Sequence, residues 1–259
     1  MVSYGPELRV RVPVLYAGWL TQAFVHWPCP LERVRRLVPD GLAVDTFDGT
    51  AWVSLTAFVM SGLRPAALPA ALPGPPDFPE TNLRTYVRRR DGREGLWFLS
   101  LEVGSAAMLA ARAVGAPAHA ARLCVARGAG TVTYTGSRGR TGPSYRLVVR
   151  PGEPLVPTAR DVWLTTRWRA CTRSLGVLWE TPVEHPPFPL RAAGLDGFSE
   201  TLTLAVGLPP PVHEPLVHFC DGIRGVRVGA SRPFGPARPA RDRARRRGKG
   251  DHHGEGSPA

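Results

Sequence analysis

The sequence contains almost no lysine: Lys249 is the single lysine among 33 basic residues, and all the others are arginine. Enzymes that form a covalent imine with a carbonyl substrate use a primary amine of lowered pKa. Lys249 lies in a carboxyl-terminal stretch rich in Arg, Pro and Gly, so we expect no lysine amine in the folded part of the chain. Imine chemistry by that part is excluded unless another chain supplies the amine.

Long apolar runs and several well-known motifs are also missing. Arg, Pro or Gly interrupts the apolar stretches, so we expect no membrane span. The first residues, MVSYGPELRVRV, lack the apolar core of a signal peptide. There is no P-loop, no Gly-x-Gly-x-x-Gly fingerprint and no Gly-x-Ser-x-Gly elbow. We therefore expect a cytoplasmic protein without a Rossmann or P-loop nucleotide domain.

Cysteine and histidine do not form a metal-binding pattern. The cysteines are few, widely spaced and never paired as Cys-x-x-Cys: Cys29, Cys124, Cys171 and Cys220. We predict that they are reduced and buried. His213, His218 and Cys220 follow an H-x4-H-x-C spacing that fits no standard zinc motif and lacks further ligands. We expect no metal and no cofactor.

Positive charge is concentrated at the carboxyl end. The net charge is +12, and residues 230–259 contribute seven Arg and one Lys against three acidic residues. This stretch has almost no large apolar side chains, so we predict a disordered tail after a single domain of residues 1–229. The alternative is a tether for nucleic acid or an anionic membrane through residues 241–249; a scaffold role through this tail is a third functional hypothesis.

Residues 1–229 are dominated by strand patterns with a few helices. We predict helices within residues 30–39, 105–114 and 158–170, the last capped by Thr158. Two strands are expected around the Asp48-Gly49 turn. Further strands are expected at residues 82–90, 96–103, 120–127, 131–137, 144–150 and 176–185. The proline-rich residues 64–79 are expected to form a surface loop or lid. The pattern favours an α+β fold: a mostly antiparallel, barrel-like sheet with a few covering helices.

The segment FPETNLRTYV carries the most chemistry. Alternate side chains of a strand share a face, so one face of this strand is wholly polar: Glu80, Asn82, Arg84 and Tyr86. In the next strand, LWFLSLEV, the residues that share a face are Phe98, Ser100 and Glu102. A hairpin loop of odd length places Arg84 and Asn82 beside Ser100 and Glu102, which keeps charges away from leucines.

The polar patch predicted from these two strands has two interpretations. Inside a barrel it is a ligand site, and on the outside of a sheet it is a solvated face. The residues of this patch are Glu80, Asn82, Arg84, Tyr86, Ser100 and Glu102.

Four segments resemble the YqjF-like family, a family of unknown function in the acetoacetate decarboxylase-like superfamily. They are FVHWPCPLERVRRLVPDGLAVDTFDGTAWVSLTAFVM, FPETNLRTYVRRRDGREGLWFLSLEV, GAPAHAARL and TTRWRACTRSLGVLWETPVEHPPFPL. The resemblance extends over roughly residues 10–228. It implies a cone-like antiparallel β-barrel with an interior pocket, and it implies no established reaction.

The resemblance also identifies a departure from the superfamily's decarboxylases. Those enzymes carry a Schiff-base lysine just after a Gly-x-Pro turn. The turn here is Gly115-Ala116-Pro117, and Ala118 and His119 follow it where the decarboxylases have Lys-Lys. Amine-dependent decarboxylation is thus not expected.

His119 has three open interpretations. Near neutral pH an imidazole serves as a general acid or base, which gives a non-covalent lyase, hydratase or isomerase with Glu80 or Glu102 as its partner. Alternatively His119 and Arg84 bind an anionic or polar ligand, or His119 is a core histidine bonded to one of those carboxylates. Whether the protein is an enzyme, and its oligomeric state, stay open.

Our leading hypothesis is binding of a small anionic or carbonyl-bearing molecule in an interior pocket. Asn82 and Arg84 would hold its oxygens, and Tyr86, Trp97 and Phe98 would be walls or supports. Three other residues are shared with the resembled family. His26 is expected to fix the chain before the first helix, His185 to approach the pocket or pack under a proline loop, and Arg167 to lie on the last helix beside Thr166.

Overall fold

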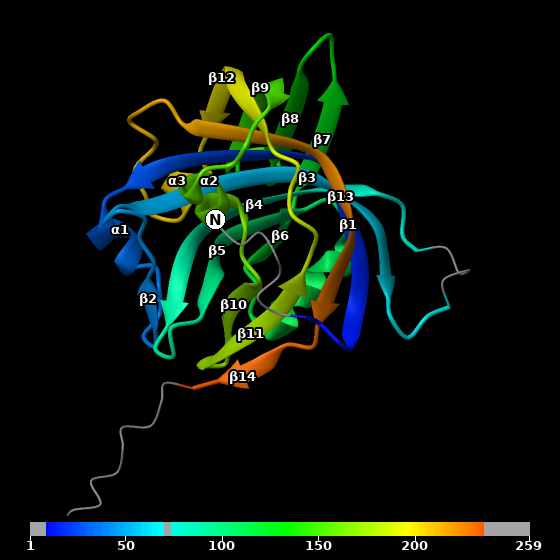
Figure 1. The fold of residues 1–259 in the computed structure, drawn as a ribbon, viewed down its shortest axis with the longest axis vertical. Coiled ribbons are helices and arrows are strands. Elements are labelled where there is room, and N and C mark those ends of the chain that lie inside the picture. Colours follow the sequence, from blue (N-terminus) through cyan, green and yellow to red (C-terminus); the bar gives the residue numbers. More distant parts are fainter. Residues whose placement is uncertain (1–8, 70–73, 236–259) are drawn as a thin grey trace, which may run out of the picture.

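A closed ring of strands forms the centre of the computed structural model, which describes residues 9–69 and 74–235. Neighbouring strands of the ring pair antiparallel except β5 with β10, and the contact of β11 with β13 completes the ring (Figure 1). In order, the ring consists of β1 (Pro13–Cys29), β3 (Ala51–Pro65), β4 (Phe78–Arg89), β5 (Glu94–Val103), β10 (Arg169–Ser174), β11 (Val177–Glu184) and β13 (Leu216–Gly229). The mostly antiparallel sheet expected from the sequence is confirmed.

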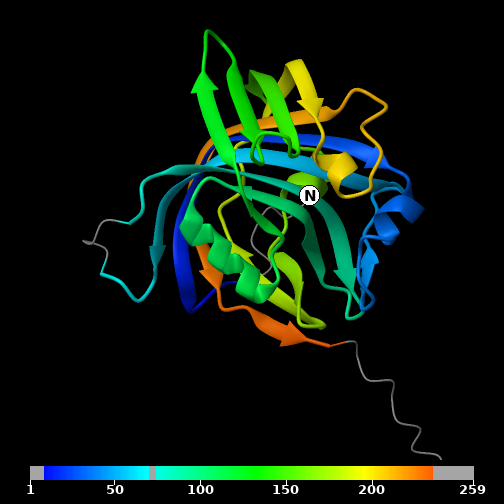
Figure 2. The same cartoon turned by 180° about the vertical axis from the view of Figure 1, so that it is seen from behind.

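A second group of strands covers part of the outer face of the ring (Figure 2). It continues from β13 through β12 (Arg191–Glu200), β9 (Ser144–Pro154), β8 (Val132–Ser137) and β7 (Arg122–Arg127). The largest apolar cluster lies between the two layers and includes Val25, Leu55 and Leu83 of the ring with Tyr134 and Leu147 of the second sheet. The outer face of the ring is therefore also a buried surface.

The helices are short. They are α1 (Leu31–Arg35), the 3-10 helix Ala106–Val114, α2 (Ala159–Thr165) and α3 (Leu202–Ala205). Thr158 caps α2 as predicted, in a reciprocal capping box with Asp161. The predicted helix over 158–170 is too long, because the chain becomes extended at Thr166 and enters β10. Arg167 therefore follows the helix and does not lie on it.

The predicted pairing around the Asp48-Gly49 turn is partly wrong. Both turn residues have positive φ, and Phe47 bridges Thr50. However, the strand before the turn, β2 (Leu42–Val44), pairs with β4 and not with β3. β3 pairs with β4 only as far as Thr85, and β2 continues the same edge of β4 from Val87 to Arg89, opposite the edge that pairs with β5.

The predicted boundary at residue 229 is also too early. β14 (Arg232–Phe234) pairs with β11, and the guanidinium of Arg89 lies 4.1 Å from the Phe234 ring centre. The rest of the predicted tail, residues 236–259, lies outside the described residues, as do residues 70–73 of the proline-rich segment. In the described ranges no helix is long and apolar enough to cross a membrane. Among the cysteines, Cys124 is exposed, contrary to expectation, and the other three are buried.

Candidate functional site

An irregularity at Leu99 decides which side chains face the interior of the ring. Arg88 pairs with Glu94 and Arg84 with Phe98, which is the register that an odd hairpin loop predicts. Leu83 then pairs with Ser100, so Leu99 is an extra residue on β5. Such a β-bulge reverses the facing of every residue that follows it.

Ser100 and Glu102 consequently face away from Arg84, and the predicted patch of six residues is not one patch. Ser100 donates to Glu102 at 2.5 Å, and the Nε of Arg138 donates to Glu102 at 2.7 Å. On the same outer face, the hydroxyls of Thr81 and Tyr145 are 2.6 Å apart. The second sheet thus supplies the polar partners for this face, which explains why polar side chains are buried there.

The inward residues of β4 line a cavity of about 110 Å³ inside the ring. Glu80, Asn82 and Arg84 contribute to it, and Phe98 faces them from β5. These four predicted residues are therefore brought together. Other polar residues reach the same cavity from β1, from the end of α2, from the start of β10 and from the segment after β11: Gln22, Thr165, Arg167, Arg169 and His185.

Arg84 is a buried cation without a carboxylate partner among the described residues. Arg84 is only 7% exposed. Its Nε and Nη2 atoms have no hydrogen-bond partner among the described residues. Burial lowers the pKa of Arg84, and the nearby Tyr86 hydroxyl partly offsets that effect. A guanidinium keeps its proton in proteins even so. The cavity therefore contains a positive charge that the protein itself does not neutralise.

The other two arginines of the cavity have acidic neighbours. Arg167 donates to Asp45 at 3.2 Å and to the Trp163 carbonyl at 2.5 Å. Arg169 lies 3.8 Å from Glu180. Arg167 and Arg169 therefore make the electrostatic potential of the cavity more positive. Because each already has an acidic neighbour, both are less available than Arg84 for an ion pair with a ligand.

Glu80 lies on the same face of β4 as Arg84 and is mostly protonated at neutral pH. Burial without a compensating charge raises its pKa to about 8. One of its oxygens has no hydrogen-bond partner among the described residues, and the same holds for the amide oxygens of Gln22 and Asn82. The cavity thus combines one cation that lacks a counter-charge with several unpaired polar atoms, a pattern that indicates a polar occupant.

Tyr86, the fourth predicted residue on this face of β4, is not among the described residues that line the cavity. Its hydroxyl donates to the Leu164 carbonyl at 2.6 Å, and Ser54 contacts the same oxygen at 2.5 Å. Because Tyr86 has one proton, Ser54 must donate to it, so Nδ1 of His26, 2.5 Å from Ser54, donates in turn. His26 is fully buried in this network.

His119 does not appear among the described residues that line the cavity. It lies on β6 (Ala118–Ala120), which pairs parallel with β5 so that His119 is level with Glu102. Burial and the neighbouring Arg138 lower its pKa, and Glu102 only partly offsets them. Ala118, one residue earlier, is 1% exposed and packs with Leu101 in a small apolar cluster. His119 thus belongs to the outer polar cluster with Glu102, apart from Arg84.

Four polar cavity residues escaped the sequence analysis as ligand contacts: Gln22, Thr165, Arg167 and Arg169. Arg167 and Arg169 are two residues apart, a strand spacing that was available in TTRWRA but was interpreted as helical. His185 lines the cavity, the first of its two expected placements. His218 bonds Asp161 at 3.1 Å, and no cluster of metal-binding residues occurs in the described ranges.

Solved structures of known proteins share this fold. One is an acetoacetate decarboxylase-like enzyme from Sphingomonas wittichii RW1, with a TM-score of 0.60, 19% identity, and coverage of 88% of this chain and 96% of that chain. Another is the enduracididine biosynthesis enzyme MppR complexed with pyruvate, with a TM-score of 0.61, 17% identity, and coverage of 89% and 94%. At these identities the similarity establishes the fold alone.

Sequence relatives establish the family. The chain is 33% identical over 229 residues to the uncharacterized protein YqjF of Bacillus subtilis (strain 168), which covers 85% of this chain and 94% of that protein. A family model described as an uncharacterized conserved protein, DUF2071, matches residues 16–224. The chain belongs to the DUF2071 family, and its fold is that of the acetoacetate decarboxylase-like proteins.

Proposed function

We propose that the protein binds a small carboxylate, such as a 2-oxo acid, in the cavity of the ring, with the carboxylate on Arg84. The observation that carries this proposal is the buried guanidinium of Arg84, which has no carboxylate partner among the described residues. A buried cation without a counter-charge is unfavourable by several kcal/mol. A ligand carboxylate supplies that charge and accepts hydrogen bonds from the fork of the guanidinium.

The remaining polar groups of the cavity suit the keto oxygen of a 2-oxo acid. Asn82 lies between Arg84 and Glu80 on β4, and a protonated Glu80 donates a hydrogen bond to a carbonyl oxygen. A cavity of about 110 Å³ is of the order of one that holds benzene, roughly 150 Å³. The space therefore suits a head group of a few non-hydrogen atoms. The pyruvate complex of the structurally similar MppR supports the same ligand class.

The proposed binding does not involve an imine. No lysine occurs among the described residues, and Ala118 follows the Gly-x-Pro turn. Non-covalent catalysis by His119 receives no support from the geometry, because His119 lies with Glu102 and not with Arg84. The basic-tail hypothesis depends on residues 241–249, which lie outside the described residues.

The test is a thermal-shift and calorimetric series with pyruvate, 2-oxobutyrate and acetate, with the uncharged methyl ester of pyruvate as the control. A ligand that binds only the native state raises the melting temperature, and the rise grows with the logarithm of the ligand concentration relative to Kd. We expect the free acids to bind and the ester not to bind. Equal binding of acid and ester would contradict a carboxylate held by Arg84.

A further inference from the structure

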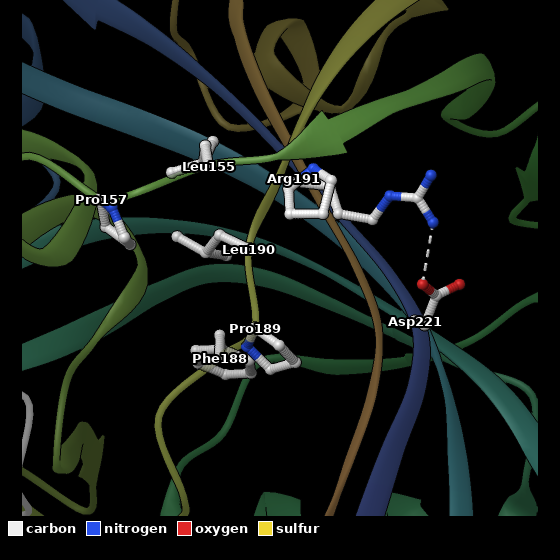
Figure 3. A pocket seen from close by; sticks show the side chains of 8 residues that line it. Leu155, Pro157, Phe188, Pro189, Leu190, Arg191 and Asp221 are labelled. Carbon is white, nitrogen blue, oxygen red and sulfur yellow. Dashed lines mark hydrogen bonds and ion pairs between the residues drawn. The ribbon is translucent and has the colours of Figure 1, made fainter.

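A cleft of about 560 Å³ lies on the surface beside the interior cavity. It lies between residues 154–157, at and after the end of β9, and residues 188–191, which lead into β12. The amide of Leu155 donates to the Leu190 carbonyl at 3.0 Å and joins the two segments. Figure 3 shows Leu155, Pro157, Pro189 and Leu190 around this hollow. Its walls are therefore mainly apolar.

The charged groups of the cleft neutralise each other. Arg191 and Asp221 form an ion pair of 3.1 Å at its edge (Figure 3). Arg191 also donates to the Gly152 carbonyl at 2.8 Å. The cleft thus offers no free charge to attract an anion. Its volume lies within the range of about 300–1,000 Å³ that is typical of small-molecule sites.

Phe188 lines both the cleft and the interior cavity. Its ring lies 4.7 Å from the ring centre of His185 and 6.1 Å from that of Trp19, and both of these residues also line the cavity. Phe188 is 8% exposed. A single aromatic side chain therefore forms the common wall between an apolar hollow at the surface and a polar cavity inside.

The backbone around Phe188 allows this side chain to turn without loss of a sheet ladder. It lies in the segment HPPFPL between β11 and β12, where Pro186, Pro187 and Pro189 have no N–H to donate. Rotation of the ring toward solvent would join the two hollows, at the expense of its contacts with His185, Trp19 and Phe24. An apolar group of a ligand in the same place restores those contacts.

We infer that the ligand is an amphipathic acid: its carboxylate binds Arg84 in the cavity, and its alkyl or aryl tail displaces Phe188 and lies in the cleft. This inference rests on the proposed function, because it uses the same head-group site. The cavity alone accepts only a few atoms, and the adjoining apolar cleft accepts the rest. The tail gains affinity with each carbon that it removes from water.

Calorimetric titration of the full chain with pyruvate and 2-oxooctanoate tests the inference, since the two acids share a head group and differ in the tail. We expect 2-oxooctanoate to bind at least ten-fold more tightly. Leu155→Asp places a charge in the cleft and is expected to abolish that advantage while pyruvate affinity stays unchanged. The matched control is Val156→Asp, because Val156 is 92% exposed and does not line the cleft.

The outcomes separate the two proposals. Unchanged pyruvate binding by Leu155→Asp shows that the variant is folded. Pyruvate binding with equal or weaker binding of 2-oxooctanoate overturns the amphipathic ligand and leaves the proposed function standing. Loss of tail-dependent affinity in Val156→Asp as well as Leu155→Asp also overturns it, because a general charge effect then explains the result. Binding of neither acid overturns both proposals.

Discussion

Glu80 and Arg84 lie on the same inward face of β4 and line one cavity, yet no ion pair joins them. Burial keeps Glu80 protonated near neutral pH, while Arg84 stays charged. Glu80 and Arg84 together therefore carry a net positive charge, although a count of one acid and one base suggests neutrality. This separation is the physical basis of the proposed carboxylate site.

Replacement of Arg84 is expected to separate stability from binding. Arg84→Met removes a buried charge without a carboxylate partner and keeps similar volume, so the free energy of unfolding of the ligand-free protein should rise by about 1–4 kcal/mol. Pyruvate binding should be lost. Urea denaturation and calorimetry measure the two effects. The control is Arg150→Met, whose ion pair with Asp196 is exposed and should change stability by no more than about 0.5 kcal/mol.

The titration of Glu80 should make stability depend on pH. Its pKa is about 8 in the folded protein, against an ordinary value near 4.5. Between these values the folded state binds more protons than the unfolded state, so stability falls as pH rises from about 4.5 to about 8. The loss is on the order of 4 kcal/mol. Denaturation curves across this range measure it, and Glu80→Gln should flatten the dependence; an unchanged slope would exclude Glu80 as its source.

The same titration should weaken ligand binding at high pH. Above pH 8 the ionised Glu80 places a negative charge in the cavity and opposes an anionic ligand. Pyruvate affinity should therefore decrease as pH rises through about 8, and should do so less in Glu80→Gln. Calorimetric titrations at pH 7 and pH 9 compare the two proteins. A decrease of equal size in both would point to another group.

His119 should be dispensable for binding. It belongs to the outer cluster with Glu102 and Arg138, so His119→Ala is expected to change pyruvate affinity by less than about two-fold, well under the tenfold step of 1.4 kcal/mol. Affinity measured by calorimetry decides the point. A large loss would restore His119 as a contact of the ligand.

No imine should form within the described residues. Treatment with pyruvate and borohydride traps imines of primary amines as stable adducts, and residues 9–235 contain no lysine. Peptide mass mapping should therefore find unmodified masses throughout this range. An adduct on any of these peptides would contradict the account.

The sequence predicted the facing of side chains well for β4 and poorly for β5. The alternation of Glu80, Asn82, Arg84 and Tyr86 gave the inward face of β4 correctly, because that strand is regular through these positions. The same reasoning failed for Ser100 and Glu102, since the extra residue at Leu99 reverses their facing. No glycine or other local signal marks this bulge in FLSL. Its polar partners, such as Arg138, come from a distant part of the chain.

The end of α2 was also predicted wrongly from the sequence. TTRWRA has apolar and basic residues at spacings that fit a helix or a strand, and short segments do not resolve the two periods. Packing against β5 and β11 fixes the extended form from Arg169 onward. This is why Arg167 and Arg169 were missed as cavity residues.

The most direct measurement of the central claim is a crystal structure of the protein with pyruvate. The account predicts pyruvate inside the ring, with its carboxylate oxygens about 2.7–2.9 Å from the guanidinium nitrogens of Arg84 and its keto oxygen toward Asn82 and Glu80. Pyruvate bound elsewhere, or inside the ring with its methyl group toward Arg84, would contradict it.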